Sequence, residues 1–228
     1  MSNPHGAPLD QRKDLYTHAF IIFACAHYWA KVREPLVASV LNLMIIEDAA
    51  YAFLAENPPP PLATLAPERT VYVGGLSKSV ATGLRVGFVA APAEWVNVLE
   101  RRIMATTWNV PGVMSAIAVG WIEDGTVAQL EAQKRADAQA RQALAAQVLT
   151  GLDYISHPSS YFLWLPLAEE IRADQIAMTL QRENISVSTA EPFAVSAHVP
   201  HALRLALGSV AMPALREALV KVRKVVAW

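Results

Sequence analysis

The stretch TVYVGGLSKSVATGLRVGFVA, residues 70–90, carries the strongest indication of fold in this chain. It begins with an apolar run at residues 70–73, passes through a Gly-Gly pair to Lys78, and ends in a second apolar run at residues 86–90. Short apolar runs bounded by glycine are typical of buried strands. We therefore expect two strands, joined by a segment that presents a lysine.

A second cation, Arg85, follows this lysine and lies between Gly83 and Gly87. Glycines let a backbone approach a ligand closely, and the planar fork of an arginine suits a phosphate group. A lysine that is desolvated beside another cation becomes nucleophilic and can form a Schiff base. The alternative is that Lys78 is a solvated surface residue, as lysines after strands usually are.

An acid and a phenol follow a third apolar run, at residues 43–46. The run ends in Glu47 and Asp48, and Tyr51 comes three residues later. This pattern is typical of a buried strand with acids at its carboxyl edge. A carboxylate can keep a pyridine nitrogen protonated, which makes the ring an electron sink. The alternative is an aspartate that caps the next helix.

The second half of the chain contains the clearest helix, expected over residues 127–149. Thr126 and Gln129 have the spacing of a capping box, and no glycine or proline interrupts the stretch before Gly151. The other elements that we expect are strands at residues 161–165, 185–188 and 203–207, and helices at residues 173–182 and 212–226. The pattern predicts an α/β fold with a second, small α/β lobe behind the long helix.

Two further polar residues could bind a ligand. Arg204 lies within the apolar strand at residues 203–207, where a charge needs a partner, and a carboxylate bound in two parallel hydrogen bonds is the natural one. The alternative is a structural ion pair with an internal Asp or Glu. Asn3 begins the run Asn-Pro-His-Gly, which taken alone is a turn.

In this order, these motifs resemble the pyridoxal-phosphate (PLP)-dependent aminotransferase class I/II superfamily, of fold type I. Residues 45–51, residues 76–78 with 83–87, and residues 203–208 carry the match. The resemblance covers essentially the whole chain from Asn3 onward. It is strongest to the aminotransferase-like domain of MocR-type transcriptional regulators and to 2-aminoadipate-type transaminases.

The resemblance implies pyridoxal 5'-phosphate as cofactor and a role for four residues around its ring. Lys78 would be the catalytic residue, forming the Schiff base and then moving a proton between the substrate and the coenzyme. Asp48 would pair with the pyridinium nitrogen. Asn3 and Tyr51 would hydrogen-bond the 3-oxygen of the ring. No metal ion is implied.

The phosphate and the substrate would be bound by further residues. Ser77 and Arg85 would hold the phosphate, and Arg204 would bind the α-carboxylate of an amino acid or 2-oxo acid. The chain departs from the family at Gly75, where many members have serine or threonine, and at Thr82, where many have proline. Each departure weakens one contact without excluding binding of the cofactor.

The resemblance also implies a domain organisation. Residues 1–125 would be a remnant of the large PLP-binding domain, and residues 126–228 the interdomain helix and the small C-terminal domain. We expect the chain to lack the first half of the large domain, with its glycine-rich phosphate loop, and any winged-helix module. Residues 17–40 form an extra apolar stretch relative to the family, so we expect exposed apolar surface.

Composition limits the partners and the location. A net charge of −1 with scattered basic residues argues against nucleic acid or a membrane as a partner of this chain. A single cysteine, Cys25, and the lack of a secretion signal are typical of a cytoplasmic protein.

Members of the family are usually homodimers with shared active sites, and the resemblance implies the same for the full-length protein.

Three functions stay open from the sequence. The first is an enzyme that transfers an amino group between an amino acid and a 2-oxo acid. The second is a ligand-sensing effector domain of a MocR-type regulator, which binds PLP or its amino-acid adduct without turnover. The third is an inactive fragment of either, which keeps the motifs but binds the cofactor poorly.

Overall fold

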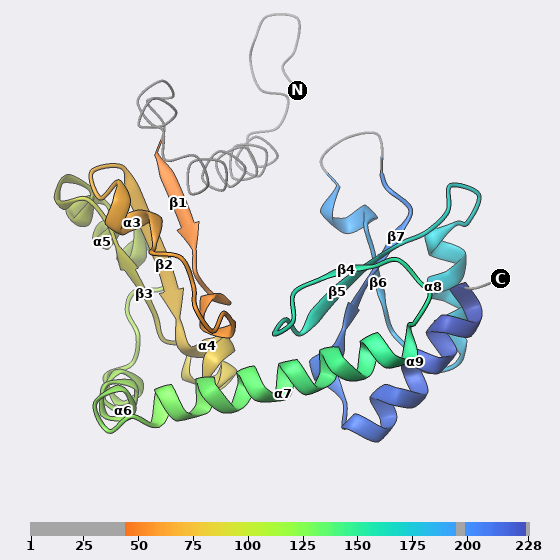
Figure 1. Ribbon diagram of the computed structural model, residues 1–228. Coiled ribbons are helices and arrows are strands. Elements are labelled where there is room, and N and C mark those ends of the chain that lie inside the picture. The colour runs from red at the N-terminus through yellow and green to blue at the C-terminus, as the bar shows by residue number, and fades with distance from the viewer. Residues whose placement is uncertain (1–43, 195–198, 227–228) are drawn as a thin grey trace, which may run out of the picture. The chain divides into compact units, whose positions relative to one another are not determined.

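The structure is a computed structural model that describes residues 44–194 and 199–226. The chain divides into two compact units, Met1–Glu131 and Ala132–Trp228. Strands and helices occur in both units (Figure 1), so the predicted α/β class is confirmed. The predicted domain boundary falls at the start of helix α7 (Thr126–Val148), which contributes residues to both units.

The first unit contains a three-stranded sheet in the order β1-β2-β3. Its strands are β1 (Ile45–Asp48), β2 (Thr70–Gly75) and β3 (Gly87–Ala90). β1 and β2 are parallel, whereas β2 and β3 are antiparallel. The carboxyl ends of β1 and β2 therefore lie at the same edge of the sheet.

Short helices follow the strands of this unit, and two longer ones complete it. After β1 come the 3-10 turn η1 (Ala52–Leu54) and α3 (Leu62–Leu65), and after β2 come α4 (Leu76–Ser79) and η2 (Thr82–Leu84). The longer helices are α5 (Ala93–Thr106) and α6 (Gly112–Glu123). Leu76, Leu84 and Ala118 are buried together, so α4, η2 and α6 share one small core.

The second unit contains a four-stranded antiparallel sheet in the order β4-β5-β7-β6. The strands are β4 (Ile155–Ser156), β5 (Phe162–Pro166), β6 (Ser188–Thr189) and β7 (Ala202–Ala206). Helices α8 (Ala173–Arg182) and α9 (Met212–Val226) complete the unit, with the 3-10 turns η3 (Glu191–Phe193) and η4 (Leu207–Ser209). Both helices have the bounds that the sequence predicts.

Alternation along the two central strands builds the core of this unit. Leu163 and Leu165 of β5, and Leu203 and Leu205 of β7, are buried in a cluster with leucines of α7, α8 and α9. Successive strand residues point to opposite faces of a sheet. One face of the sheet is therefore packed, and the residues between the leucines lie on the other face.

Two local predictions are wrong. The strand expected at residues 185–188 is only the two-residue β6, because Ile185 and Val187 pack against the core from the preceding loop. The capping box at Thr126 is also absent, because Thr126 is already helical. Its N–H instead donates to the Asp124 carboxylate at 2.8 Å, after a tight turn at Gly125 with φ 83°.

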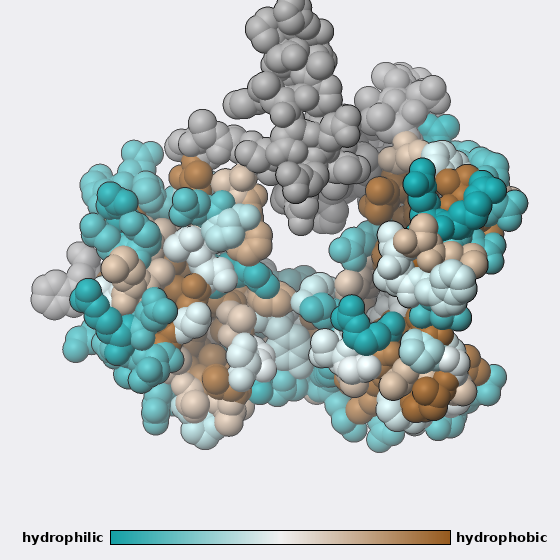
Figure 2. All heavy atoms as spheres, turned by 180° about the vertical axis from the view of Figure 1, so that it is seen from behind, coloured by the Kyte–Doolittle hydropathy of each residue, from teal (hydrophilic) through white to brown (hydrophobic). Residues whose placement is uncertain are grey.

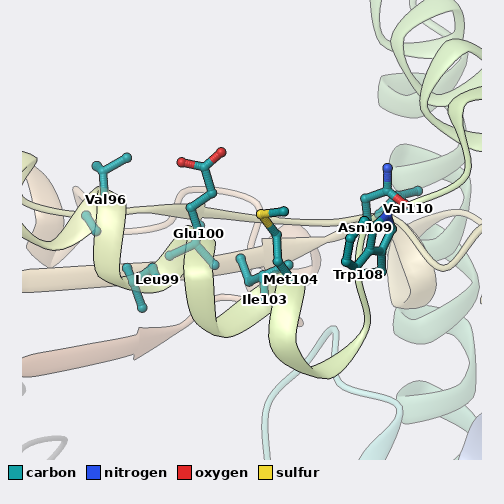
Figure 3. A pocket seen from close by; sticks show the side chains of 10 residues that line it. Val96, Leu99, Glu100, Ile103, Met104, Trp108, Asn109 and Val110 are labelled. Carbon is teal, nitrogen blue, oxygen red and sulfur yellow. The ribbon is translucent and has the colours of Figure 1, made fainter.

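Among the described residues, no helix combines the length and the hydropathy needed to cross a bilayer. Many large apolar side chains are nevertheless exposed, and Figure 2 shows apolar residues among the polar ones at the surface. A pocket of about 650 Å³ on the first unit is lined mainly by apolar residues, and half of its lining residues are exposed large apolar ones. Figure 3 shows Val96, Glu100 and Met104 at four-residue intervals along α5, with Trp108 beyond its end. No residue predicted to bind the cofactor lines this pocket.

Candidate active site

Lys78 lies on α4, which begins directly where β2 ends. Leu76 at the start of α4 is 5% exposed and packs with Leu84, while the Lys78 side chain is exposed. The chain reverses at this point, and the Leu76 N–H donates to the Val86 carbonyl at 3.0 Å. The apolar residues therefore hold the turn in place, and the lysine projects from it.

Tyr51 approaches this lysine from the neighbouring strand. β1 is in register with β2, so that Asp48 pairs with Val73, and the Ala49 N–H donates to the Val73 carbonyl at 2.9 Å. The chain then continues to Tyr51, whose ring centroid lies 5.9 Å from Lys78 Nζ. Parallel pairing thus brings the predicted lysine and phenol together at the edge of the sheet where Asp48 ends its strand.

The two adjacent acids at this edge have different roles. The Glu47 carboxylate accepts hydrogen bonds from the N–H groups of Leu62 and Ala63, both at 3.1 Å, and so caps α3. The Asp48 carboxylate accepts only a local bond, from the Ala50 N–H at 2.9 Å, through Oδ1. Its second oxygen bonds to no residue that the structure describes. Glu47 therefore caps α3, and Asp48, for which the sequence had left helix capping open, does not cap that helix.

The Gly-Gly pair has a structural reason that the sequence does not indicate. A Cβ at Gly74 would overlap the ring of Phe88, which lies across from it on β3. A Cβ at Gly75 would lie 3.1 Å from the Val86 carbonyl oxygen. These glycines serve the close approach of β2 and β3. A serine at position 75 would therefore require the backbone at Val86 to shift.

Arg85 ends η2 in a left-handed backbone conformation, with φ 53°. This conformation is costly for a residue with a Cβ, and such strain concentrates at functional sites. The side chain is exposed, and its guanidinium bonds to none of the described residues. The hydroxyl of Ser77 likewise lacks a hydrogen-bond partner within the described ranges.

Arg204 lies in the middle of β7, in the second unit. It is half-buried, and its guanidinium carbon lies 4.2 Å from the ring centroid of Phe162 and 5.5 Å from that of Phe193. Within residues 44–194 and 199–226, no acid pairs with it. The structural ion pair considered as the alternative is therefore not found there.

The predicted site residues are thus only partly brought together. Asp48, Tyr51, Ser77, Lys78 and Arg85 all belong to the first unit, near or beyond the ends of β1 and β2. Arg204 belongs to the second unit, and Asn3 lies outside the described residues. The aromatic neighbours of Arg204 had not been predicted as part of a site. An aromatic at every second position of β5, opposite its leucines, is the signal that could have indicated Phe162, whereas Phe193 lies in the turn η3 and carries no such signal.

The family comparison agrees with the motifs on which this geometry rests. The family described as Aminotransferase class I and II matches residues 29–222 of the chain. The match includes Asp48, Lys78, Arg85 and Arg204. The chain belongs to this family.

Individual relatives fall into two groups. The first group is HTH-type transcriptional regulators. An example is the uncharacterized regulator YdeF of Bacillus subtilis, which is 28% identical over 74% of this chain and 37% of its own length. The second group is aminotransferases. An example is the 2-aminoadipate transaminase of Thermus thermophilus, which is 25% identical over 78% of this chain and 48% of its own length. This chain therefore spans between a third and a half of these relatives.

A solved structure with a similar fold is also that of an aminotransferase. The crystal structure of LysN, an α-aminoadipate aminotransferase from Thermus thermophilus, superimposes with a TM-score of 0.73 at 20% identity. The superposition covers 97% of this chain and 55% of the other. The mixed α/β fold is therefore that of about half of such an aminotransferase.

Proposed function

We propose that this chain binds pyridoxal 5'-phosphate through Lys78 and serves the transfer of an amino group between an amino acid and a 2-oxo acid. The observation that carries the proposal is the approach of Lys78 Nζ to the Tyr51 ring, 5.9 Å apart, at the edge where Asp48 ends its strand. Family membership supports it. So does the LysN crystal structure, whose bound compound is N-(5'-phosphopyridoxyl)-L-leucine.

The free polar groups of the first unit have the chemistry that this cofactor needs. An oxygen of Asp48 suits a protonated ring nitrogen, and the guanidinium of Arg85 with the hydroxyl of Ser77 suits a phosphate. None of these three groups is bonded to another described residue. A ligand with one basic nitrogen and one phosphate would supply partners for all of them.

Each residue then has a separate task. When bound, pyridoxal phosphate supplies an aldehyde that condenses with amines and a ring that withdraws electrons from the neighbouring carbon. Lys78 provides the amine, and as a free amine it moves a proton to and from the substrate α-carbon. Asp48 keeps the proton on the ring nitrogen. Tyr51 donates a hydrogen bond to the 3-oxygen of the ring, a task that we also propose for Asn3.

The remaining residues bind anions. Arg85 and Ser77 would hold the phosphate of the cofactor. Arg204 binds the substrate α-carboxylate through two parallel N–H···O bonds. We accordingly assign residues 1–125 to the PLP-binding domain and residues 126–228 to the interdomain helix and small domain.

The first test is the visible absorbance of the purified chain mixed with pyridoxal phosphate. We expect a band that is present in the parent, absent in Lys78→Ala and shifted by an added amino acid. Lys224→Ala is the matched control, because Lys224 is also an exposed helical lysine and free aldehydes react with surface amines. Reduction with borohydride followed by peptide mapping should place the pyridoxyl group on Lys78.

The outcomes are distinct. A Lys78-dependent band supports the proposal, and production of a 2-oxo acid from the added amino acid would establish transamination. A folded chain without such a band would contradict the proposal and leave an inactive fragment. Equal labelling of Lys78 and Lys224 would also contradict it.

A second candidate function is a ligand-sensing effector domain, which the similarity to the HTH-type regulator favours. Such a domain would bind the cofactor and an amino acid without turnover. It predicts a Lys78-dependent band that shifts with the amino acid, while no 2-oxo acid accumulates. Measuring the spectrum and the product in the same sample separates the two functions.

A further inference from the structure

We propose that Phe162 is a positioning residue that holds the guanidinium of Arg204 ready for a carboxylate, with Phe193 as a weaker second support. This inference rests on the proposed role of Arg204 in binding the substrate carboxylate. It adds two residues that act through Arg204 and do not themselves bond the ligand.

The face of the sheet that carries Arg204 is distinct from the packed face. Its neighbours in β7, Leu203 and Leu205, are buried in the core, so Arg204 points to the opposite side. Trp164 of β5 and Ser188 of β6 are its direct partners across the strands. Residues directly opposite each other in paired strands share a face. The guanidinium therefore lies among uncharged neighbours in the sheet.

Aromatic rings support a guanidinium without using its donors. The ring face is negative and attracts the cation, while the N–H groups point outward in the guanidinium plane. A carboxylate partner from the protein would instead occupy the fork that a substrate needs. The Arg204 guanidinium makes no hydrogen bond to any described residue, so its fork is open on that part of the chain. Aromatic support thus suits a binding role better than an ion pair would.

Hydrogen bonds fix the backbone of Phe162 in the sheet. Its carbonyl accepts hydrogen bonds from Ser156 Oγ at 2.8 Å and from Nε2 of the buried Gln142 at 3.1 Å. Its backbone also pairs with Ala206, two residues beyond Arg204 in β7. The strand that carries the ring and the strand that carries the guanidinium are therefore in fixed register.

Phe193 is the weaker support on three counts. It lies farther from the guanidinium, at 5.5 Å compared with 4.2 Å for Phe162. It belongs to the short turn η3 and not to a strand, and it is 54% exposed. Because a solvated cation–π contact is weaker than a desolvated one, we rank Phe193 below Phe162.

The test is carboxylate binding by the ¹⁵N-labelled whole chain, measured through the Arg204 Nε–H resonance, which Arg204→Lys identifies by its loss. Propionate is the probe, with sodium chloride at equal ionic strength as reference, and no cofactor is needed. We expect Phe162→Leu to weaken propionate binding by about fivefold, Phe193→Leu to weaken it less, and Phe162→Tyr to restore it to within about twofold. Phe88→Leu, on the other unit, is the control that should change nothing.

A spectroscopic signature accompanies the affinity. Atoms above a ring face are shielded, so the Nε–H resonance of ligand-free Phe162→Leu should move to higher frequency, and Phe162→Tyr should restore it. Unchanged propionate affinity in Phe162→Leu, or equal weakening in Phe162→Tyr, would overturn the inference and leave the proposed function intact. If propionate does not shift the Arg204 Nε–H resonance of the parent chain, both this inference and the carboxylate-binding role of Arg204 are overturned. The Lys78-dependent absorbance band tests the cofactor role independently.

Discussion

At the scale of single residues, Arg85 combines a strained backbone with an open side chain. Its φ of 53° lies in the left-handed region, although glycine occupies two positions close to it, at 83 and 87. A non-glycine residue there costs about 1 kcal/mol or more. The guanidinium makes no hydrogen bond or ion pair with the described residues that would offset this cost. This combination is expected where a side chain serves a ligand.

The comparison of Arg85→Gly with Arg85→Ala separates the two properties. Both variants lose the guanidinium, so both should bind pyridoxal phosphate about tenfold or more weakly in an absorbance titration. Only glycine relieves the strain, so Arg85→Gly should be more stable than Arg85→Ala by about 0.5–1 kcal/mol in urea unfolding. Equal free energies of unfolding for Arg85→Ala and Arg85→Gly would mean that the backbone at position 85 is not strained.

At the scale of elements, a polar cluster joins α7 to the strands of the second unit. The Tyr161 hydroxyl lies 2.9 Å from Asp137 Oδ2 and 3.0 Å from the Lys134 carbonyl. Arg141 Nε donates to the same Asp137 oxygen at 2.8 Å, and Arg141 Nη1 donates to the Leu207 carbonyl at 2.7 Å. The cluster therefore links the helix both to the residue before β5 and to the residue after β7.

The cluster predicts a stability change at alkaline pH. Burial and the hydrogen bond to Asp137 raise the pKa of Tyr161 from 10.0 to about 12. The folded state thus holds this proton more tightly than the unfolded state does. Its contribution to stability is complete below pH 10 and is lost as the pH rises through about 12.

Tyr161→Phe checks this expectation. At neutral pH the variant should be less stable than the parent by about 0.5–1.5 kcal/mol, because it loses one hydrogen bond. Between pH 10 and 12 the parent should lose more stability than the variant, so the difference shrinks. Urea unfolding across this range is the measurement, with Tyr154→Phe as a control for the loss of a phenol elsewhere. A difference that stays constant with pH would contradict the prediction.

At the scale of the whole molecule, the two units have separate cores among the described residues. The core of the second unit joins α7, α8 and α9 to the packed face of its sheet, whereas that of the first unit joins α4, η2 and α6. Each core lies within one unit. We therefore expect a core substitution in one unit to act mainly on that unit.

Leu203→Ala is the test, because Leu203 is fully buried in β7. The cavity should lower the stability of the second unit by about 3 kcal/mol. Amide hydrogen exchange should accelerate in β5 and β7 and stay unchanged in β1 and β2. The matched variant Val71→Ala, buried in β2, should give the reverse pattern. Equal acceleration in both units would mean that they unfold as one.

The sequence predicts the second unit better than the first. Helices α8 and α9 have the expected bounds because their apolar faces follow the helical period against one core. Helices α5 and α6 have no counterpart among the predicted elements. α6 is apolar almost all round and shows little periodicity, and α5 exposes many of its apolar residues, so neither presents one buried stripe.

Local patterns in the chain were enough to identify the family, the strand that ends in Asp48 and the lysine that follows the next strand. Contacts between elements decided the rest: that Glu47 and not Asp48 caps α3, that Gly74 makes room for a ring, and that Phe162 lies against Arg204. The reason is physical. Periodicity and turn chemistry depend on residues close in sequence, whereas the meeting of two side chains depends on the pairing and register of strands, which long-range packing sets.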